Sequence, residues 1–351
     1  MKILPNNSSL IYSGRIDWSD PFAIVWTYPG TFVRIKFKGT QLSIHVRNKH
    51  NYWNNYLGVV EGDAQTKLLL PKEGEATIEI PLQTTQDNIH EVTIFKRQDA
   101  CHELTILDFE INCNTDDECE LLEASPLPPR RIEVYGDSVS AGEVSEAVDY
   151  VAKSDPEHNG EYSNSWYSYA WIAARKLDAQ LHDIAQGGIA LLDNTGWYHE
   201  PDYIGMEHVW NKMRYDSSYG QVTEWDFSKY TPDIVIVAIG QNDSHPDDYM
   251  KTDYECEKAK NWRTHYRQFL AKLRETYPDA WIICCTTLLQ HDISWDMSIG
   301  QAVLDIADKK ISHCVFQRNG KATPGHLRIP EAEEMAEELC HYIHSLNIEG
   351  Y

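Results

Sequence analysis

The hydrophobic pattern changes once along the chain, at a proline-rich stretch, and this change most constrains the fold. Before about residue 120, apolar and polar residues alternate in short runs such as TFVRIKFKG (31–39), HEVTIFKR (90–97) and ELTILDFEI (103–111). Alternation with period two is typical of half-buried strands, and several such strands between turn signals predict an antiparallel sandwich or jelly roll. We therefore expect an all-β domain over residues 1–124, followed by a proline-rich linker over 125–131.

After the linker, strand and helix patterns alternate. PDIVIVAIG (232–240) and AWIICCTTL (280–288) are continuous apolar runs, as expected of parallel strands that are buried on both faces. EKAKNWRTHYRQFLAKLRE (257–275), between them, has helical periodicity. Residues 132–351 are therefore predicted to form an α/β three-layer domain with a parallel sheet.

Charge and composition exclude several classes of partner. The formal net charge is −23, so the long-range field of the protein repels nucleic acid, anionic lipid and polyanionic substrates. The sequence contains no apolar run long enough for a signal peptide or a membrane span, and its eight cysteines form no CxxC pair. We expect a cytoplasmic enzyme with reduced thiols, in which the adjacent Cys284 and Cys285 fill core space.

Candidate catalytic residues follow three of the predicted strands. In YGDSVSAGE (135–143), Ser138 follows a strand and begins a helix, which leaves its backbone N–H free. In VAIGQND (237–243), Asn242 can direct its amide toward an oxyanion. In DIAQGGIALLDN (183–194), a glycine pair permits close approach of the backbone to a ligand. Because ligands bind beyond the carboxyl ends of parallel strands, these residues are expected at one edge of the sheet.

Each of these features also has a purely structural explanation. Asp137 and Ser138 are common helix caps, Asn242 suits an Asx turn, and a glycine pair suits an ordinary loop. The fourth candidate, His326, lies on a Pro-Gly turn in KATPGHLRIPEAEEM (321–335), directly before a predicted helix. A nucleophile, oxyanion donors and a base in this order are far more specific together than any one of them.

The order serine, glycine, asparagine, histidine resembles the SGNH (GDSL-type) hydrolases. The first half, with YSGRID, VRIKFKGTQLSI, NYWNNYLGVVEGD and HEVTIFKRQDA, is similar to the jelly-roll domain of carbohydrate esterase family 2, whose members remove acetyl groups from plant polysaccharides. The resemblance implies an SGNH catalytic domain with Ser138 as nucleophile and His326 as base. It also implies an oxyanion hole formed by the backbone N–H of Ser138, Gly188 and Asn242, with the neighbouring Gly187 as the alternative glycine donor.

The expected acid partner of His326 is missing from its usual place. Most SGNH enzymes have an aspartate three residues before the histidine, where this chain has Thr323, whose hydroxyl carries no charge. Some members of carbohydrate esterase family 2 work with a Ser-His dyad. We therefore expect His326 to act in a dyad, with Nδ1–H bound to a main-chain oxygen or to a carboxylate from elsewhere in the chain.

The resemblance predicts a serine esterase that removes O-acetyl groups from mannan- or xylan-derived oligosaccharides through an acetyl-enzyme. Two rival functions remain open, a lipid esterase or thioesterase of the same superfamily and an inactive carbohydrate-binding protein. Trp295, which follows a buried strand in LLQHDISWDMSIG (288–300), is a candidate sugar platform, with core packing as the alternative. No motif implies a metal or other cofactor, no nucleic-acid or membrane partner is expected, and the oligomeric state stays open.

Overall fold

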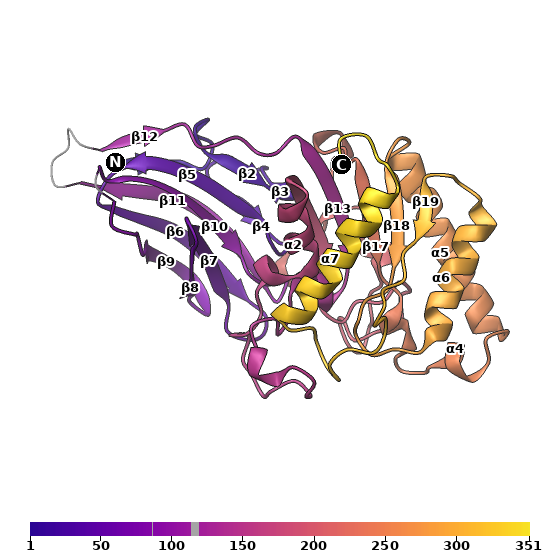
Figure 1. Ribbon diagram of the computed structural model, residues 1–351. Helices are drawn as coiled ribbons and strands as arrows, with labels where there is room; N and C mark the ends of the chain where they lie inside the picture. Colours follow the sequence, from indigo (N-terminus) through magenta and orange to yellow (C-terminus); the bar gives the residue numbers. More distant parts are fainter. Residues whose placement is uncertain (86, 114–118) are drawn as a thin grey trace. The chain divides into compact units, whose positions relative to one another are not determined.

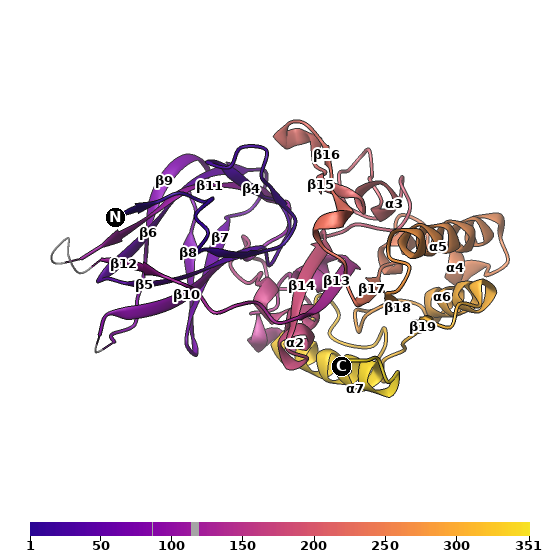
Figure 2. The ribbon, with the colours of Figure 1, turned by 90° about the horizontal axis from the view of Figure 1, so that it is seen from above.

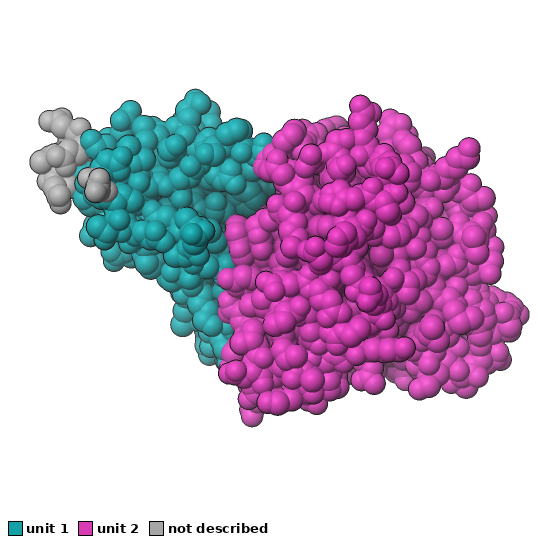
Figure 3. Space-filling view, viewed as in Figure 1, with its two compact units in different colours: residues 1–127, 159–161, 213–224 teal, residues 128–158, 162–212, 225–351 magenta. Residues whose placement is uncertain are grey.

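The computed structural model describes residues 1–85, 87–113 and 119–351, which form two compact units (Figure 3). Unit 1 comprises Met1–Leu127 together with two short later segments, Asn159–Glu161 and Met213–Glu224. Unit 2 comprises the remaining residues from Pro128 onward. The hydrophobic pattern alone gave no reason to assign the two later segments to the β half.

Unit 1 is built from two antiparallel sheets (Figure 1). Strands β2, β5 and β10 have the bounds Ile11–Ser13, Phe32–Lys38 and Ile89–Lys96. The first sheet has the order β3 (Ile16–Asp17), β4 (Ile24–Trp26), β11 (His102–Asn112), β6 (Gln41–His50), β9 (Glu73–Ile80), with β1 (Lys2–Ile3) paired to β11. The second has the order β12 (Glu120–Leu122), β5, β10, β7 (Tyr56–Glu61), β8 (Ala64–Leu69), with β2 paired to β5.

One hydrophobic core joins the two sheets of unit 1. Along β6 the buried side chains Leu42, Ile44 and Val46 alternate with more exposed ones, as the period-two pattern predicts. They share a buried cluster with side chains of the other sheet, among them Ile35 and Ile94. Burial of one face of each sheet therefore stabilises a β-sandwich, and the prediction of an all-β first half is confirmed.

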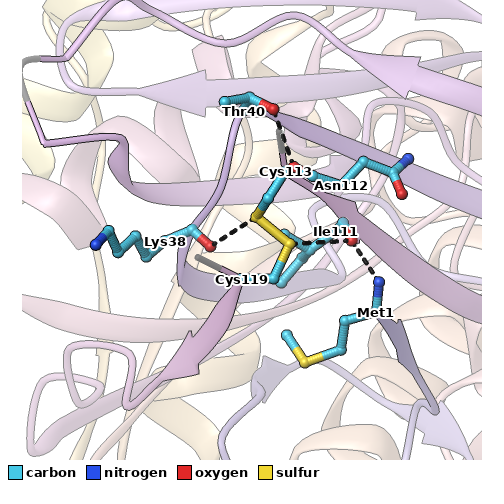
Figure 4. The surroundings of a disulfide bond; sticks show 7 residues. All are labelled: Met1, Lys38, Thr40, Ile111, Asn112, Cys113 and Cys119. Carbon is cyan, nitrogen blue, oxygen red and sulfur yellow. Dashed lines mark hydrogen bonds between the residues drawn. A yellow bond between two sulfur atoms is a disulfide. The ribbon is translucent and has the colours of Figure 1, made fainter. Parts of the chain in front are cut away.

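A disulfide bond connects the end of β11 to the start of β12. Cys113 and Cys119 are bonded to each other, and their sulfur atoms approach the main-chain oxygens of Lys38 and Ile111, respectively (Figure 4). The N-terminal amine of Met1 donates to the same Ile111 oxygen at 2.5 Å. The expectation that all thiols are reduced is therefore wrong for this pair.

Unit 2 contains a five-stranded parallel sheet. Its order is β14 (Ala179–Ala185), β13 (Arg130–Gly136), β17 (Ile234–Ala238), β18 (Trp281–Cys285), β19 (Ile311–His313). All five residues of β17 are buried, as its continuous apolar run predicts. Cys284 and Cys285 are fully buried in β18, which confirms that they fill core space.

Helices cover both faces of this sheet, so unit 2 is the predicted three-layer α/β fold. In Figure 2, α2 (Tyr169–Lys176) and α7 (Ile329–Ser345) lie along one face, and α5 (Glu257–Thr276) lies along the other. The helix α6 (Ile293–Ile306) packs beside α5 and against β18 and β19. The remaining helices are short: α1 (Ser138–Ala141), η2 (Val148–Tyr150), η3 (Ser165–Tyr167), α3 (Met206–Val209), η5 (Phe227–Lys229), η6 (Gln241–Ser244) and α4 (Tyr249–Thr252). The short β15 (Lys212–Arg214), η4 (Ser217–Tyr219) and β16 (Thr223–Glu224) lie around the later segment of unit 1.

The start of α2 is set by a cap just after a short 3₁₀ turn. Residues Ser165–Tyr167 form a separate 3₁₀ turn, and the Ser168 side chain then accepts a hydrogen bond from the Trp171 N–H. This N-cap fixes the start of α2 at Tyr169. Among the helices of the described residues, none has both the length and the hydropathy that a membrane span needs.

The order of strands places a topological switch point at β13, the second strand of the sheet. The chain goes from β13 to β14 on one side and then to β17 on the other side of β13. In open parallel sheets, ligands bind beyond the carboxyl ends of the strands at such a point. Ser138 follows β13 and Asn242 follows β17, so both residues lie at this edge.

Candidate active site

Ser138 is the first residue of α1, directly after β13. The preceding Asp137 caps this short helix, because its Oδ1 accepts a hydrogen bond from the Val139 N–H at 3.0 Å. Gly136 is required at the end of the strand, since a Cβ there would lie 2.0 Å from Ser140 Oγ. Ser138 is largely buried, and its hydroxyl has no hydrogen-bond partner among the residues that the structure describes.

His326 has a carboxylate partner that sequence reasoning did not identify. Its Nδ1 lies 2.7 Å from Oδ2 of Asp155, and its backbone N–H donates to Oδ1 of the same residue at 3.0 Å. Asp155 precedes His326 by 171 residues, in the segment between η2 and η3. A carboxylate on Nδ1 fixes the imidazole tautomer and stabilises the imidazolium. Of the two partners expected for Nδ1–H, a main-chain oxygen or a carboxylate from elsewhere in the chain, the structure has the carboxylate, that of Asp155.

Arg328 holds this carboxylate in place. Its Nη2 lies 2.9 Å from Asp155 Oδ1, and its Nη1 donates to the main-chain oxygen of His326. The Arg328 side chain is fully buried. Although burial acts to raise the pKa of Asp155, the hydrogen bonds and charge of His326, together with Arg328, hold that pKa well below its usual range. Asp155 is therefore ionised throughout the neutral range.

Thr323, at the position where an acid is usual, has a different role. Its Oγ1 accepts a hydrogen bond from the Ala152 N–H at 2.8 Å and donates to Glu331 Oε1 at 2.8 Å. Glu331 lies in the first turn of α7 and also accepts from the Thr323 N–H. Thr323 thus fixes the segment that carries Asp155 to the start of α7.

A second carboxylate approaches His326 from the opposite side of the ring. Glu143 Oε2 lies 3.7 Å from His326 Nε2, while the Glu143 backbone N–H donates to the main-chain oxygen of Ser138 at 2.9 Å. Burial acts to lower the pKa of His326, but Glu143, Asp155 and Asp137 raise it to about 9. Glu143 therefore connects the end of α1 to the histidine, next to the nitrogen that would take the Ser138 proton.

The two predicted oxyanion donors lie in neighbouring loops. Gly188 has φ +73, and a Cβ there would lie 2.8 Å from the Trp197 Cβ, so both conformation and space favour glycine. Its N–H has no acceptor within the described part of the chain. Asn242 Nδ2 lies 3.2 Å from Asp137 Oδ2 and 3.0 Å from the Ile189 oxygen. Its two N–H bonds are thus already directed at protein acceptors.

A buried network joins the ends of three strands at this edge. Gln241, after β17, donates from Nε2 to Asp137 Oδ2 at 2.7 Å, and its Oε1 accepts from the Thr287 hydroxyl at 2.8 Å. Burial raises the pKa of Asp137 to about 6, against the hydrogen bonds that it accepts from Val139 and Gln241. The network fixes the Asp137 carboxylate, and with it the first turn that presents Ser138.

The predicted role of Trp295 as a sugar platform is wrong. Trp295 lies in α6 with no exposed surface, donates from Nε1 to Asp248 Oδ1 at 3.1 Å, and packs edge-on against Trp262. An exposed tryptophan lies instead beside the oxyanion glycine. Trp197 is 57% exposed, its backbone N–H donates to the Gly188 oxygen at 2.8 Å, and its ring stacks on His245.

A cavity of about 460 Å³ lies next to these loops and falls within the usual size range of small-ligand sites. The loop after β14 contributes Leu192 and Asn194 to its wall, the loop after β17 contributes His245, and α5 contributes Asn261. His245 is therefore part of both the cavity wall and the stacked pair with Trp197. Within the described residues, no group of three or more histidine, cysteine, aspartate or glutamate side chains is placed to hold a metal ion.

Two sequence comparisons relate the chain to carbohydrate esterases. Residues 12–117 match the family model described as carbohydrate esterase 2 N-terminal. Over 345 residues the chain is 29% identical to the cellulase/esterase CelE of Acetivibrio thermocellus, which covers 95% of this chain but 39% of that protein. The chain therefore has an N-terminal domain of carbohydrate esterase family 2, and it is similar to esterases along nearly its whole length.

Two further relatives agree with this family. The acetylxylan esterase / glucomannan deacetylase of Cellvibrio japonicus is 27% identical over 281 residues, which covers 77% of this chain and 69% of that protein. The solved structure of a family two carbohydrate esterase from Clostridium thermocellum, in complex with cellohexaose, has a TM-score of 0.79 and 25% identity, and covers 96% of this chain and 98% of that one. The named relatives are carbohydrate esterases, which is consistent with a carbohydrate O-acetyl esterase.

Three residues of this candidate site could not be found from the sequence. No sequence motif marks Asp155 or Glu143, because single acidic residues in loops are common on protein surfaces. Trp197 follows the glycine pair by nine residues, a spacing that places it near Gly188 only once the loop has turned back. The one feature of the sequence that could have indicated Trp197 is its place in the same loop as the predicted oxyanion donor Gly188.

Proposed function

We propose that this protein is a serine esterase that removes O-acetyl groups from acetylated plant oligosaccharides derived from mannan or xylan. The single observation that carries the proposal is the hydrogen bond from His326 Nδ1 to the ionised Asp155, in a domain that has a serine at the carboxyl end of β13. This is the arrangement that a serine nucleophile and its base require. The relatives named as deacetylase and esterases support acetyl as the acyl group.

In the proposed reaction, Ser138 Oγ attacks the acetyl carbonyl carbon while its proton passes to Nε2 of His326. The carbon–oxygen bond to the sugar then breaks, and the sugar oxygen takes the proton from Nε2. Water next attacks the acetyl-Ser138 carbonyl and gives a proton to Nε2. Acetate leaves as Ser138 Oγ regains that proton, so each turnover consumes one water and returns the serine to its starting state.

Three donors stabilise the oxyanion in both steps, the N–H of Ser138, the N–H of Gly188 and Nδ2 of Asn242. The Gly188 N–H has no acceptor among the described residues, so it is available to the oxyanion. Asn242 must turn one N–H away from a protein acceptor, and the longer bond, 3.2 Å to Asp137, is the one that the oxyanion replaces. Of the two glycines, Gly188 is therefore the proposed donor.

Recognition of a sugar is proposed to use Trp197 and the adjacent cavity. An exposed indole face stacks well on the apolar face of a pyranose ring, and Trp197 lies directly beside the oxyanion glycine. The net charge of −23 favours a neutral substrate over an anionic one. We also propose that the β-sandwich of unit 1 has the jelly-roll arrangement implied by the family.

The cytoplasmic location expected from the sequence remains a prediction. The disulfide between Cys113 and Cys119 argues against it, because disulfides persist mainly in oxidising compartments. Cell fractionation, with thiol labelling of the protein from each fraction, distinguishes a cytoplasmic location from an oxidising compartment.

Acetate release from acetylated mannan and xylan oligosaccharides tests the proposal, with the products assigned by NMR. Activity on 4-nitrophenyl esters should fall steeply from acetate to octanoate if the acyl pocket fits acetyl. A flat or rising series would favour the lipid esterase or thioesterase of the same superfamily. Binding of oligosaccharides without any ester hydrolysis would leave a carbohydrate-binding protein.

A further inference from the structure

The catalytic histidine lies between two carboxylates, one for each ring nitrogen. Asp155 Oδ2 is 2.7 Å from Nδ1, and Glu143 Oε2 is 3.7 Å from Nε2. No hydrogen bond joins His326 to Ser138, both of which lie in the described part of the chain. The nearest charged group to the catalytic nitrogen is thus a glutamate.

This geometry disfavours the form of His326 that catalysis needs. A base must be neutral, with its proton on Nδ1 toward Asp155 and a lone pair on Nε2. That lone pair would then face the Glu143 carboxylate, which offers only further lone pairs. In the protonated form, each ring N–H group points at a carboxylate. The attraction to Glu143 is strengthened because the glutamate side chain is only 13% exposed.

We propose that Glu143 is a positioning residue that holds Nε2–H of the protonated His326 in the free enzyme, and so sets the pH above which the base acts. The proposal rests on the proposed role of His326 as the base of an esterase. The backbone N–H of Glu143 donates to the main-chain oxygen of Ser138, so the Glu143 side chain starts from the same turn as the nucleophile. A proton on Nε2 must leave before Ser138 can transfer its own.

Four charged groups surround the imidazole, and their contributions differ in sign. Glu143 and Asp155 contact the ring nitrogens, and Asp137 adds a third negative charge from the end of β13. Arg328, at the start of α7, opposes them, but it is paired with Asp155 and bound to the His326 oxygen. The balance raises the pKa of His326, and Glu143 is the largest of the contributions that raise it.

The test compares pH profiles of kcat/KM on 4-nitrophenyl acetate for the parent and Glu143→Gln. The parent should rise with pH to an apparent pKa near 9, because the protonated histidine is inactive. Removing a carboxylate this close should lower that pKa by about 1–3 units. At pH 7 the variant should therefore be at least about tenfold faster, with little change on the alkaline plateau.

Two further variants separate this effect from general charge or structure. Asp149→Asn removes one negative charge from the same loop region at an exposed position, and its profile should not move. Glu143→Asp keeps the charge but withdraws it, so its pKa should lie between parent and Glu143→Gln. A profile for Glu143→Gln that coincides with the parent would overturn the proposal, as would an equal shift for Asp149→Asn.

An NMR titration keeps this test independent of the proposed function. The imidazole of His326 can be followed by its carbon and nitrogen shifts in Ser138→Ala, with and without Glu143→Gln. The same downward shift of the His326 pKa is expected there, whatever ester the enzyme takes. If the parent hydrolyses no acetyl ester, the esterase proposal fails. If the imidazole pKa is unchanged by Glu143→Gln, the role of Glu143 fails instead.

Discussion

At the scale of single residues, the site depends on a carboxylate that comes from far along the chain. Asp155 accepts two hydrogen bonds from His326 and an ion pair from Arg328, so its position is determined by three contacts. These contacts hold the imidazole in the tautomer that leaves Nε2 available for the Ser138 proton. Thr323, in the usual place of the acid, only anchors the loop.

Asp155→Asn should lower kcat on 4-nitrophenyl acetate by about 10³–10⁴, because an amide cannot stabilise the imidazolium and can hold the wrong tautomer. Thr323→Ala should cost less than about tenfold, since it removes a loop contact and no charge on His326. Initial rates at saturating substrate, with circular dichroism to verify folding, provide the measurement. Equal losses in the two variants would show that both act only through the loop.

Two tryptophans offer a matched test of sugar binding. Trp197→Ala should raise KM for acetylated oligosaccharides several-fold while sparing 4-nitrophenyl acetate, because it removes the exposed part of an indole ring that also stacks on His245. Trp295→Ala removes a fully buried ring and should instead destabilise the fold by about 3–5 kcal/mol. Steady-state kinetics and thermal melts of both variants distinguish the roles. A Trp197→Ala variant with unchanged KM on every oligosaccharide would exclude it as a platform.

At the scale of elements, the sequence predicted most of the strands and helices but only part of the site. Strong periodicity over 90–97 or 257–275 leaves few alternatives, and β10 and α5 form there. Ser138, Gly188, Asn242 and His326 follow strands or precede a helix, so topology alone brings them toward one edge. Asp155 lies in a segment without periodicity, and its contact with His326 depends on how that loop folds back.

One strand contains a buried acid that the mechanism does not use. Asp183 lies in β14, and neither carboxylate oxygen has a hydrogen-bond partner among the described residues. Burial raises the pKa of Asp183 well above its usual value. Its folded-state pKa exceeds its unfolded-state pKa, so the unfolded state releases the proton first, and the folded state loses stability as pH rises between the two.

Asp183→Asn should therefore stabilise the protein at pH 7 and have little effect near pH 4. The gain should grow by about 1.4 kcal/mol for each pH unit between the unfolded and folded pKa of the aspartate. Urea unfolding of both proteins at several pH values from 4 to 8 measures it. Thr276→Ala, whose hydroxyl donates only to the main-chain oxygen of Lys272, serves as a control whose effect should not vary with pH. A difference between parent and Asp183→Asn that is constant across pH would contradict the assigned cause.

At the scale of the whole molecule, the boundary in the sequence is not the boundary of the packed units. The linker at 125–131 separates two hydrophobic patterns, yet unit 1 also recruits residues 213–224 from beyond it. Arg214 in that segment donates to Glu103 at 2.8 and 2.9 Å, and Tyr219 donates its hydroxyl hydrogen to the Ala100 oxygen at 2.6 Å. A cut at the linker therefore removes the partners of a segment that belongs to unit 1.

A fragment of residues 128–351 should consequently be less stable than the full chain, with residues 213–224 open to proteolysis. The physical reason is that Arg214 and Tyr219 lose buried, charge-assisted or main-chain partners when residues 1–127 are absent. Limited proteolysis with mass spectrometry, beside thermal melts of both proteins, provides the measurement. Addition of residues 1–127 as a separate polypeptide should restore protection. A fragment as stable and as protease-resistant as the full chain would show that the later segment contributes nothing to folding of the catalytic half.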